Sequence, residues 1–412
     1  MQNFCGSPWF HVKIGVDGRF HECRWSRSQP TDYNIKTHSI TDFMNSPHMR
    51  ELRVGMTQDK KFDGCSACHK MEAFSKISGR EKQNLKLGIY GDVSKTIPSS
   101  RFYNDFKHSQ DNDGFTSREP MDLQLDLGNI CNSACIFCSP ESSSTLGKEW
   151  EKLNFIEKSK VTGWTDDATV QKFCDEISTL NIKYIHFIGG ETLLIPGFLK
   201  ILQSLDKNAT VGFTVNATVW KDEVIEELEK FDNVHLGISV ECFHKVNDFL
   251  RYPSKISNVE RNIQRWMQVN DEWTISLRTT PTVFSIPYLY TVYTFALEND
   301  VFVESCNFLE QPEFLRPTIL AKPQREESIQ RLQEVADSIE TINQSPNSNA
   351  RDKNNVKAVL KHDIESYVKY LSEADSESFR VPEMKRFVET IGRSRNMDIR
   401  DYFEHYDKYF GL

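Results

Sequence analysis

The chain has 412 residues, of which 38% are hydrophobic and 26% charged, and its formal net charge is −9 at pH 7. This composition indicates a globular protein of roughly two to three domains and excludes a low-complexity chain. No stretch approaches the roughly 18–20 consecutive apolar residues that span a bilayer, the first residues lack a signal-peptide pattern, and the acidic balance disfavours nucleic-acid binding. We therefore expect a cytoplasmic protein with neither a membrane nor a nucleic acid as its partner.

The first elements predicted along the chain are a hairpin and a helix. Residues 8–25 predict a β-hairpin, because apolar residues alternate before a turn at Asp17 and Gly18 and a second short strand follows. Thr41 is a candidate cap for a helix that continues through residues 43–56. Together these elements predict a small α+β module.

From residue 121 to residue 310, short apolar strands alternate with helical segments. The expected strands cover residues 121–127, 184–188, 211–215, 234–240, 274–280 and 301–309. Six βα repeats predict a parallel sheet, which right-handed crossovers would curl into a partial (β/α)6 TIM-type barrel. The active face is expected at the carboxyl ends of the strands.

Two segments flank the predicted barrel. Residues 76–120 are polar, and the loop signal at residues 78–84 predicts an irregular connection. Beyond residue 311, long helical periods predict a helical C-terminal region. The fold class is therefore α/β, and the expected divisions are an N-terminal module (1–75), a linker (76–120), the barrel (121–310) and the helical C-terminal region (311–412).

Three of the ten cysteines, Cys131, Cys135 and Cys138, follow the first barrel strand at spacings of four and three. A [4Fe–4S] cluster normally binds four thiolates, so a loop with three leaves one iron open for a substrate or cofactor. Unrelated core cysteines, or a zinc loop that lacks its fourth ligand, are the alternatives.

This segment resembles the radical S-adenosylmethionine (SAM) superfamily, whose hallmark is Cys-x3-Cys-x2-Cys with an aromatic residue, here Phe137, before the third cysteine. The resemblance implies a [4Fe–4S] cluster whose open iron binds SAM. It also implies an oxidoreductase or transferase in which the reduced cluster cleaves SAM to a 5′-deoxyadenosyl radical that abstracts hydrogen from a substrate. An electron donor such as flavodoxin or ferredoxin would be a partner.

Further residues match the superfamily at the ends of the predicted strands. Gly189, Gly190 and Glu191 stand where the family has its Gly-Gly-Glu motif, and glycines there let backbone carbonyls approach the methionine amino group of SAM. Asn216 takes the place of the asparagine in a frequent Thr-Asn-Gly turn, with Ala217 instead of glycine. Ordinary strand-end turns are the alternative for both motifs.

Further candidate residues lie at the end of the fourth strand, in the segment that follows it, and in the sixth strand. Ser239 and Glu241 match a position where many relatives hydrogen-bond the ribose hydroxyls of SAM. Arg251 resembles the arginine that pairs with the methionine carboxylate, and a solvated or salt-bridged arginine is the alternative. Cys306 is a candidate catalytic hydrogen donor to a substrate radical, and a buried structural cysteine is the alternative.

The N-terminal cysteines Cys5, Cys23, Cys65 and Cys68 have the number required for a closed four-thiolate site. Their spacing alone does not separate zinc from a [4Fe–4S] cluster. With their neighbours they resemble the SPASM/twitch module, which implies a second, auxiliary [4Fe–4S] cluster without an open iron. In most relatives this module follows the radical SAM domain, whereas here it precedes it.

The two resemblances together imply a radical SAM enzyme with an auxiliary cluster. Because SPASM/twitch relatives often modify ribosomally made peptides, a peptide side chain is the expected substrate. A sugar or a small metabolite is the alternative, and transfer RNA ranks lower because no basic stripe is present. A non-catalytic iron–sulfur or zinc protein is disfavoured, because an electron carrier has no use for a three-thiolate cluster with an open iron.

Overall fold

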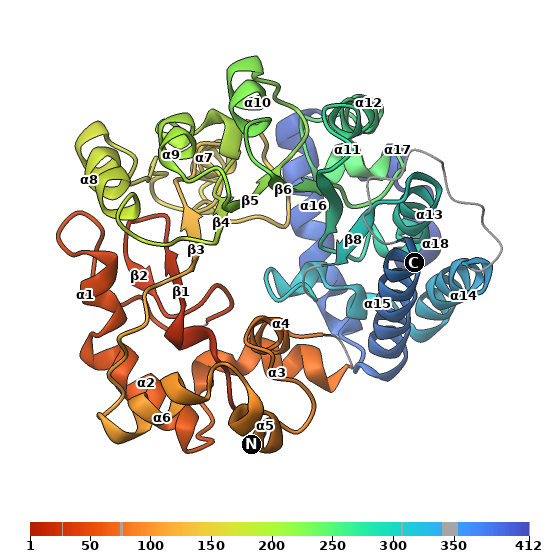
Figure 1. Ribbon diagram of the computed structural model, residues 1–412. Helices are drawn as coiled ribbons and strands as arrows, with labels where there is room; N and C mark the ends of the chain where they lie inside the picture. The colour runs from red at the N-terminus through yellow and green to blue at the C-terminus, as the bar shows by residue number, and fades with distance from the viewer. Residues whose placement is uncertain (27, 75–76, 306–307, 340–352, 412) are drawn as a thin grey trace. The chain divides into compact units, whose positions relative to one another are not determined.

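The computed structural model describes residues 1–26, 28–74, 77–305, 308–339 and 353–411 (Figure 1). The chain divides into two compact units. The first unit comprises Met1–Asn129, Val161–Gly212 and Glu223–Asp232, and the second comprises Ile130–Lys160, Phe213–Asp222 and Asn233–Leu412. In the part of the chain that the structure describes, no helix combines the length and the apolar character needed to cross a bilayer.

The first unit contains a four-stranded sheet in the order β2-β1-β3-β4. Its strands are β1 (His11–Ile14), β2 (Phe20–His21), β3 (Asp122–Asp126) and β4 (Tyr184–Ile188). Its helices are α1 (Ile40–Met44), α2 (Pro47–Thr57), α3 (Ser66–Ala73), α4 (Gly79–Lys86), α5 (Val93–Thr96), α6 (Tyr103–Asp111), α8 (Asp167–Ile177) and α9 (Phe198–Ser204). Strand β1 pairs antiparallel with β2 and parallel with β3, and β3 pairs parallel with β4.

The second unit contains three parallel strands in the order β6-β7-β8. They are β6 (Asn233–Ser239), β7 (Thr274–Thr279) and β8 (Phe302–Ser305). The helices are α7 (Ser144–Lys152), α11 (Val246–Leu250), α12 (Ile256–Met267), α13 (Tyr290–Asn299), α14 (Lys322–Ser338), α15 (Lys353–Glu373), α16 (Val381–Arg395), α17 (Ile399–Tyr402) and α18 (Tyr406–Phe410). Strand β5 (Thr210–Val215) and helix α10 (Asp222–Leu228) each cross a boundary between the units.

The parallel strands have one apolar and one polar face. In β7, Ile275 and Leu277 are fully buried, while Ser276 and Arg278 project from the opposite face because successive side chains of a strand alternate. Strand β3 repeats this pattern, with apolar residues at its second and fourth positions. In both strands the apolar face supplies the core, and the opposite face carries polar side chains.

The predicted α/β class is confirmed, with a mostly parallel sheet and a helical C-terminal region. Strands β3 to β8 fall within or within one residue of the expected ranges, and α14, α15 and α16 form the helical region predicted beyond residue 311. The predicted N-terminal hairpin is confirmed as β1 and β2, with Gly18 at a φ of +81° in the turn between them. The domain boundaries and the cytoplasmic location stay predictions.

The helix expected after Thr41 is two helices, and its predicted cap is wrong. Ser39 caps α1, because its hydroxyl accepts from the backbone N–H of Asp42 and the Asp42 carboxylate accepts from the N–H of Ser39. Ser46 caps α2, and Pro47 occupies the first turn of that helix. A serine and a proline at this point restart the helix, which the apolar periodicity alone did not indicate.

The expectation of an irregular connection at residues 76–120 is also wrong, because this segment contains α4, α5 and α6. Helix α4 begins with a capping box, in which Ser78 Oγ accepts from Glu81 N at 3.2 Å and Glu81 Oε2 accepts from Ser78 N at 2.8 Å. Gly79 is required here, since a Cβ atom at this position would lie 2.2 Å from the Trp25 ring. The polar composition hid a helix whose start signal is in the sequence.

The N-terminal module joins the barrel strands by extending their sheet. His11 of β1 lies opposite Asp122 of β3, and its Nδ1 is 3.1 Å from the Asp122 carboxylate. Arg24 Nη2 donates to the same carboxylate at 3.0 Å. Asp122 is only 2% exposed, so this contact is a buried polar anchor between the module and β3.

Candidate functional site

The loop that carries Cys131, Cys135 and Cys138 lies in the second unit, directly before α7. The first turn of α7 holds this loop, because Cys131 N donates to Ser144 Oγ at 3.3 Å and Thr145 Oγ1 donates to Cys131 O at 2.5 Å. The loop conformation is therefore tied to a regular helix start.

The three thiols of this loop are near enough for their charges to act on one another, and Cys135 is buried while Cys131 and Cys138 are partly exposed. Burial, together with the negative charge of Cys135 and Cys131, raises the pKa of the Cys138 thiol to about 12. Burial also raises the pKa of Cys135, while the positive charges of Arg251 and Arg395 lower it. Because metals bind thiolates, a grouped set of thiols with cations beside them fits an iron–sulfur cluster.

Arg251 and Glu241 form a buried ion pair beside these cysteines. Arg251 Nη1 donates to Glu241 Oε1 at 2.8 Å, and the backbone N–H of Thr280 donates to Glu241 Oε2 at 2.6 Å. The Arg251 guanidinium also lies 5.8 Å from the centre of the Phe137 ring. The structure thus brings together three residues that the sequence singled out separately, and their predicted contacts with SAM stay predictions.

Arg395, at the end of α16, is a residue of this site that the sequence did not indicate. Its Nη2 donates to the Ala134 carbonyl at 2.6 Å, and its guanidinium binds the Glu149 carboxylate of α7. The Arg395 guanidinium also lies 4.8 Å from the centre of the Tyr252 ring. No motif marks this arginine, because only tertiary packing brings α16 to the cysteine loop.

Asn216 holds the cysteine loop from another side. Its Nδ2 donates to Asn132 Oδ1 at 2.8 Å and to Ser133 Oγ at 3.0 Å. Ala217, which stands where the family has glycine, has a φ of +57°, so the turn keeps the left-handed conformation that glycine favours. Ser239 ends β6 and pairs in register with Arg278 of β7.

The Gly189-Gly190-Glu191 motif lies in the first unit, after β4. Gly190 N donates to Gly128 O at 2.8 Å, and a Cβ atom at Gly189 would lie 2.6 Å from that same oxygen. Gly189 has a φ of +148°. Glu191 is buried, and its carboxylate accepts from the backbone N–H of Leu193 at 3.3 Å. Glycine is therefore required at position 189 by the close approach of the Gly128 backbone, and contact of the motif with SAM stays a prediction.

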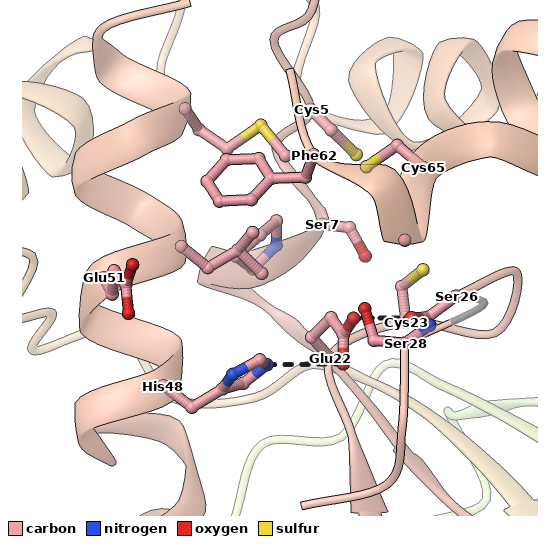
Figure 2. Close-up of a pocket in the computed structure, with 14 residues that line it drawn as sticks. Cys5, Ser7, Glu22, Cys23, Ser26, Ser28, His48, Glu51, Phe62 and Cys65 are labelled. Atoms are coloured by element: carbon pink, nitrogen blue, oxygen red, sulfur yellow. Dashed lines mark hydrogen bonds and ion pairs between the residues drawn. The ribbon is translucent and has the colours of Figure 1, made fainter. Parts of the chain in front are cut away.

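The four N-terminal cysteines form a second group in the first unit. Cys5, Cys23 and Cys65 line a cavity of ≈ 230 Å³ (Figure 2). Burial, together with the charges of Cys65 and Cys68, raises the pKa of Cys5 to about 12. Burial and the charges of Cys5 and Cys68 also raise the pKa of Cys23. Three thiols that line one cavity, together with Cys68, whose charge acts on Cys5 and Cys23, fit a closed four-thiolate cluster.

Polar residues that the sequence did not single out line the same cavity. Glu22 Oε2 lies 3.4 Å from His48 Nε2, and Ser26 Oγ donates to Glu22 Oε1 at 2.5 Å, as Figure 2 shows. Leu52 and Met56 of α2 give the cavity an apolar side. The only signal for Glu22 in the sequence is its place next to Cys23.

The remaining cysteines lie apart from both groups or outside the described residues. Cys174 is in α8, and Cys242 is fully buried after β6. All nine cysteines that the structure describes have free thiols, and among the described residues no three His, Cys, Asp or Glu side chains stand in the arrangement that holds a single metal ion. Cys306 lies outside the described residues, so its role as a hydrogen donor stays a prediction.

Comparison with known families agrees with both groups of cysteines. Residues 125–278 match the radical SAM superfamily, and residues 5–69 match the iron–sulfur cluster-binding domain called SPASM. The first match contains Cys131, Cys135 and Cys138, and the second contains all four N-terminal cysteines. The predicted cofactors, a [4Fe–4S] cluster with SAM and an auxiliary iron–sulfur cluster, are confirmed at the level of these domains.

Individual proteins are similar over shorter stretches. The sporulation killing factor maturation protein SkfB of Bacillus subtilis (strain 168) is 30% identical over 135 residues, which are 32% of this chain and 29% of SkfB. GTP 3′,8-cyclase of Streptomyces coelicolor is 30% identical over 102 residues, which are 24% of this chain and 27% of the cyclase. The matched stretches thus span less than a third of each of these two curated relatives.

Similar solved structures include the AdoMet-bound protein anSMEcpe, with a TM-score of 0.41 and 17% identity over 55% of this chain and 63% of that chain. SuiB of Streptococcus suis, bound to S-adenosylmethionine, has a TM-score of 0.36 and 14% identity over 83% of this chain and 72% of that chain.

Proposed function

On the premise that the chain combines a radical SAM superfamily domain with an SPASM cluster-binding domain, we propose that it is an enzyme that reductively cleaves SAM and abstracts hydrogen from a peptide side chain. The observation that carries this proposal is the group of thiols at Cys131, Cys135 and Cys138, with Arg251 beside them. Three thiols leave one position of a cubane for a cofactor, and the arginine supplies a cation for an anionic group on it.

Cys131, Cys135 and Cys138 would hold the catalytic cluster, and Cys5, Cys23, Cys65 and Cys68 would hold the auxiliary one. When bound, the reduced catalytic cluster supplies an electron that cleaves the sulfonium bond of SAM, and the resulting 5′-deoxyadenosyl radical takes a hydrogen atom from the substrate. The protein itself positions these groups and shields them from water.

The residues around the cysteine loop perform that positioning. Asn216 fixes Asn132 and Ser133, so the loop between the first two cysteines keeps one conformation. Glu241 holds Arg251 in a buried ion pair, which fixes the direction of the guanidinium before an anion arrives. We assign Arg251 to the methionine carboxylate of SAM, and Ser239 and Glu241 to its ribose.

A peptide is favoured as substrate because the relative SkfB is named as a maturation protein of a sporulation killing factor. A small metabolite is the second candidate, because a GTP 3′,8-cyclase is similar over a stretch of comparable identity. An acidic one-electron donor such as flavodoxin would reduce the catalytic cluster.

The proposal is tested by SAM cleavage under anaerobic conditions. Reconstituted protein reduced with dithionite should release 5′-deoxyadenosine from SAM, and the Cys135→Ala variant should not. Equal release by both proteins would refute the proposed reaction. If added GTP increases the formation of 5′-deoxyadenosine and is itself consumed, the small-metabolite candidate is favoured over a peptide.

A further inference from the structure

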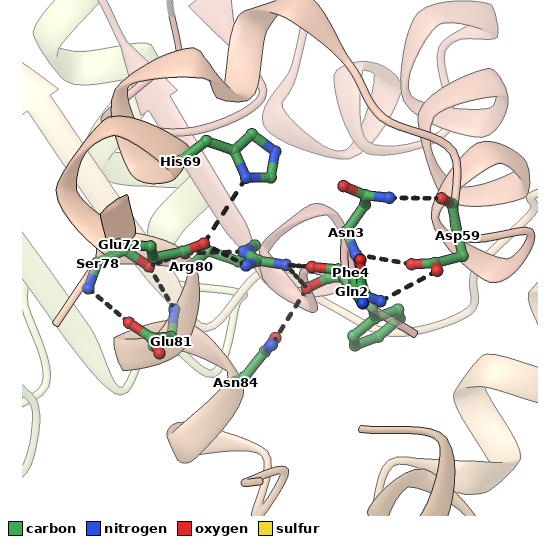
Figure 3. Close-up of polar contacts among 10 residues, drawn as sticks. All are labelled: Gln2, Asn3, Phe4, Asp59, His69, Glu72, Ser78, Arg80, Glu81 and Asn84. Atoms are coloured by element: carbon green, nitrogen blue, oxygen red, sulfur yellow. Dashed lines mark hydrogen bonds and ion pairs between the residues drawn. The ribbon is translucent and has the colours of Figure 1, made fainter. Parts of the chain in front are cut away.

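Helix α4 holds the backbone on both sides of Cys5. Arg80 Nη1 donates to the carbonyl oxygen of Phe4 at 3.5 Å, and Asn84 Nδ2 donates to the same oxygen at 3.2 Å. Asn84 Oδ1 accepts from the backbone N–H of Gly6 at 2.8 Å. Figure 3 shows Arg80 and Asn84 both directed at the Phe4 carbonyl. The position of the Cys5 ligand therefore depends on α4.

The start of the same helix contacts α3, the helix that carries Cys68, because Ser78 Oγ donates to Glu72 Oε1 at 2.6 Å. The backbone N–H groups of Gly79 and Arg80 lie in the first turn of this eight-residue helix, where they have no partner within the helix and carry its partial positive charge.

Glu72 brings the opposite charge to the same thiols. It lies four residues after Cys68 on α3, and its carboxylate accepts from Arg80 Nε at 3.0 Å, from Arg80 Nη2 at 2.5 Å and from Ser78 Oγ at 2.6 Å. Residues four apart on a helix lie on the same face, so α3 presents Glu72 on the face that carries Cys68. The Arg80 and Glu72 side chains are only 12% and 20% exposed, so water screens their charges incompletely.

We propose that Arg80 and Glu72 form an opposed charge pair that sets the reduction potential of the N-terminal cluster, with Arg80 raising the potential and Glu72 lowering it. The inference rests on the proposed function, in which the four N-terminal cysteines hold an iron–sulfur cluster. Reduction transfers one electron from an external donor to that cluster, and no bond is formed or broken. The guanidinium favours the added negative charge, whereas the carboxylate disfavours it.

Arg80 and Glu72 act through charge and hydrogen bonds, so they are positioning residues. Their role is tested by measuring the midpoint reduction potential of the N-terminal cluster. The full chain with Cys135→Ala is reconstituted with iron and sulfide, so that the remaining signal comes from the N-terminal cluster, and is titrated with dithionite under electron paramagnetic resonance. Arg80→Gln should lower the midpoint potential and Glu72→Gln should raise it. Each substitution should change the ratio of reduced to oxidised cluster at a fixed potential at least tenfold. For a one-electron couple, a tenfold change corresponds to a shift of about 59 mV in the midpoint potential.

Two matched variants separate charge from structure. Lys82→Gln removes a positive charge from an exposed position on the same helix and should leave the potential unchanged. Arg80→Lys keeps the charge and should stay nearer to the wild type than Arg80→Gln. If Arg80→Gln does not retain iron, the proposal is tested by Glu72→Gln alone, whose midpoint potential should lie above that of the parent protein.

Shifts in the same direction for Arg80→Gln and Glu72→Gln, or no shift in Glu72→Gln at full iron content, would overturn the inference. Zinc in place of iron at this site in the Cys135→Ala protein would instead overturn the cluster assignment, and the inference with it. Metal analysis therefore distinguishes failure of the proposed function from failure of the charge pair.

Discussion

The guanidinium of Arg395 donates to both carboxylate oxygens of Glu149, with N–O distances of 2.8 and 2.6 Å. Glu149 belongs to α7, which directly follows the catalytic cysteine loop, and Arg395 ends α16 in the C-terminal region. A further donor of Arg395 reaches Ala134 O, one residue before Cys135. The C-terminal helix α16 therefore holds the backbone next to Cys135, a proposed cluster ligand.

Replacing Arg395 should destabilise the fold and weaken the catalytic cluster. Arg395→Met removes the only cation paired with the Glu149 carboxylate among the residues that the structure describes and leaves Ser394 as its hydrogen-bond donor, which should lower the free energy of unfolding by about 3 kcal/mol. Because the loop loses its contact at Ala134, the reconstituted variant should also retain less iron. Urea denaturation and iron analysis check these two outcomes.

Arg393→Met is the matched control, since Arg393 lies on the exposed face of the same helix and makes no contact with Glu149 in the structure. It should retain wild-type stability and iron content. Wild-type iron content in Arg395→Met would show that the loop does not need the C-terminal region.

The two groups of cysteines should load iron independently. Two cubanes predict about eight irons per reconstituted chain, and Cys135→Ala and Cys65→Ala should each retain about four. Cys174→Ala should keep about eight, because Cys174 lies in α8 apart from both groups. Iron and zinc are measured together in each variant, and about four irons with one zinc in the wild type would support a structural zinc site in place of the auxiliary cluster.

Asp122→Asn should loosen the join between the N-terminal module and β3. Burial acts to raise the pKa of this carboxyl, but the charges of His11 and Arg24 hold it well below its usual range. The variant leaves Arg24 and Lys86 without a carboxylate, so the free energy of unfolding should fall by about 3 kcal/mol at pH 7. Denaturation of Asp111→Asn, at an exposed position in α6, is the control.

The contribution of the Asp122 carboxylate to the free energy of unfolding should depend on pH in one direction. A carboxyl whose pKa is lowered in the folded state stabilises the protein above its ordinary pKa, and this stabilisation is lost as the pH falls through the lowered value. The stability difference between the wild type and Asp122→Asn should therefore be complete above about pH 4 and shrink below it. A difference that grows as the pH is lowered would contradict the assignment.

Ala217→Gly should stabilise the protein, because Ala217 has a φ of +57° and glycine adopts this conformation without steric cost. The expected gain in the free energy of unfolding is about 1 kcal/mol. The same change at Ala336, inside α14, should cost about 1 kcal/mol. Chemical denaturation of the two variants compares them directly. A change in the free energy of unfolding with the same sign in both variants would exclude the conformational explanation.

The sequence by itself determined the local features of both sites. The spacing of Cys131, Cys135 and Cys138 after a strand, and the four thiols that begin with Cys5, depend on chain neighbours and on strand and turn periodicity, which are readable residue by residue. The strands can also be predicted, because their periodicity depends on neighbouring residues in the chain. Helix α4 was missed although Ser78 and Glu81 carry its capping signal, because the polar composition around them also fits a loop.

Only the tertiary structure decided which distant residues support those ligands. Arg395 reaches Glu149 from the far end of the chain, and Arg80 joins Phe4 to Glu72, although no spacing or motif connects them. Such partners are chosen by packing, because a buried arginine requires carboxylate and carbonyl acceptors wherever the fold brings them within hydrogen-bond distance. The identity of a cluster ligand is a property of local sequence, whereas the charge around it depends on how helices from separate segments pack together.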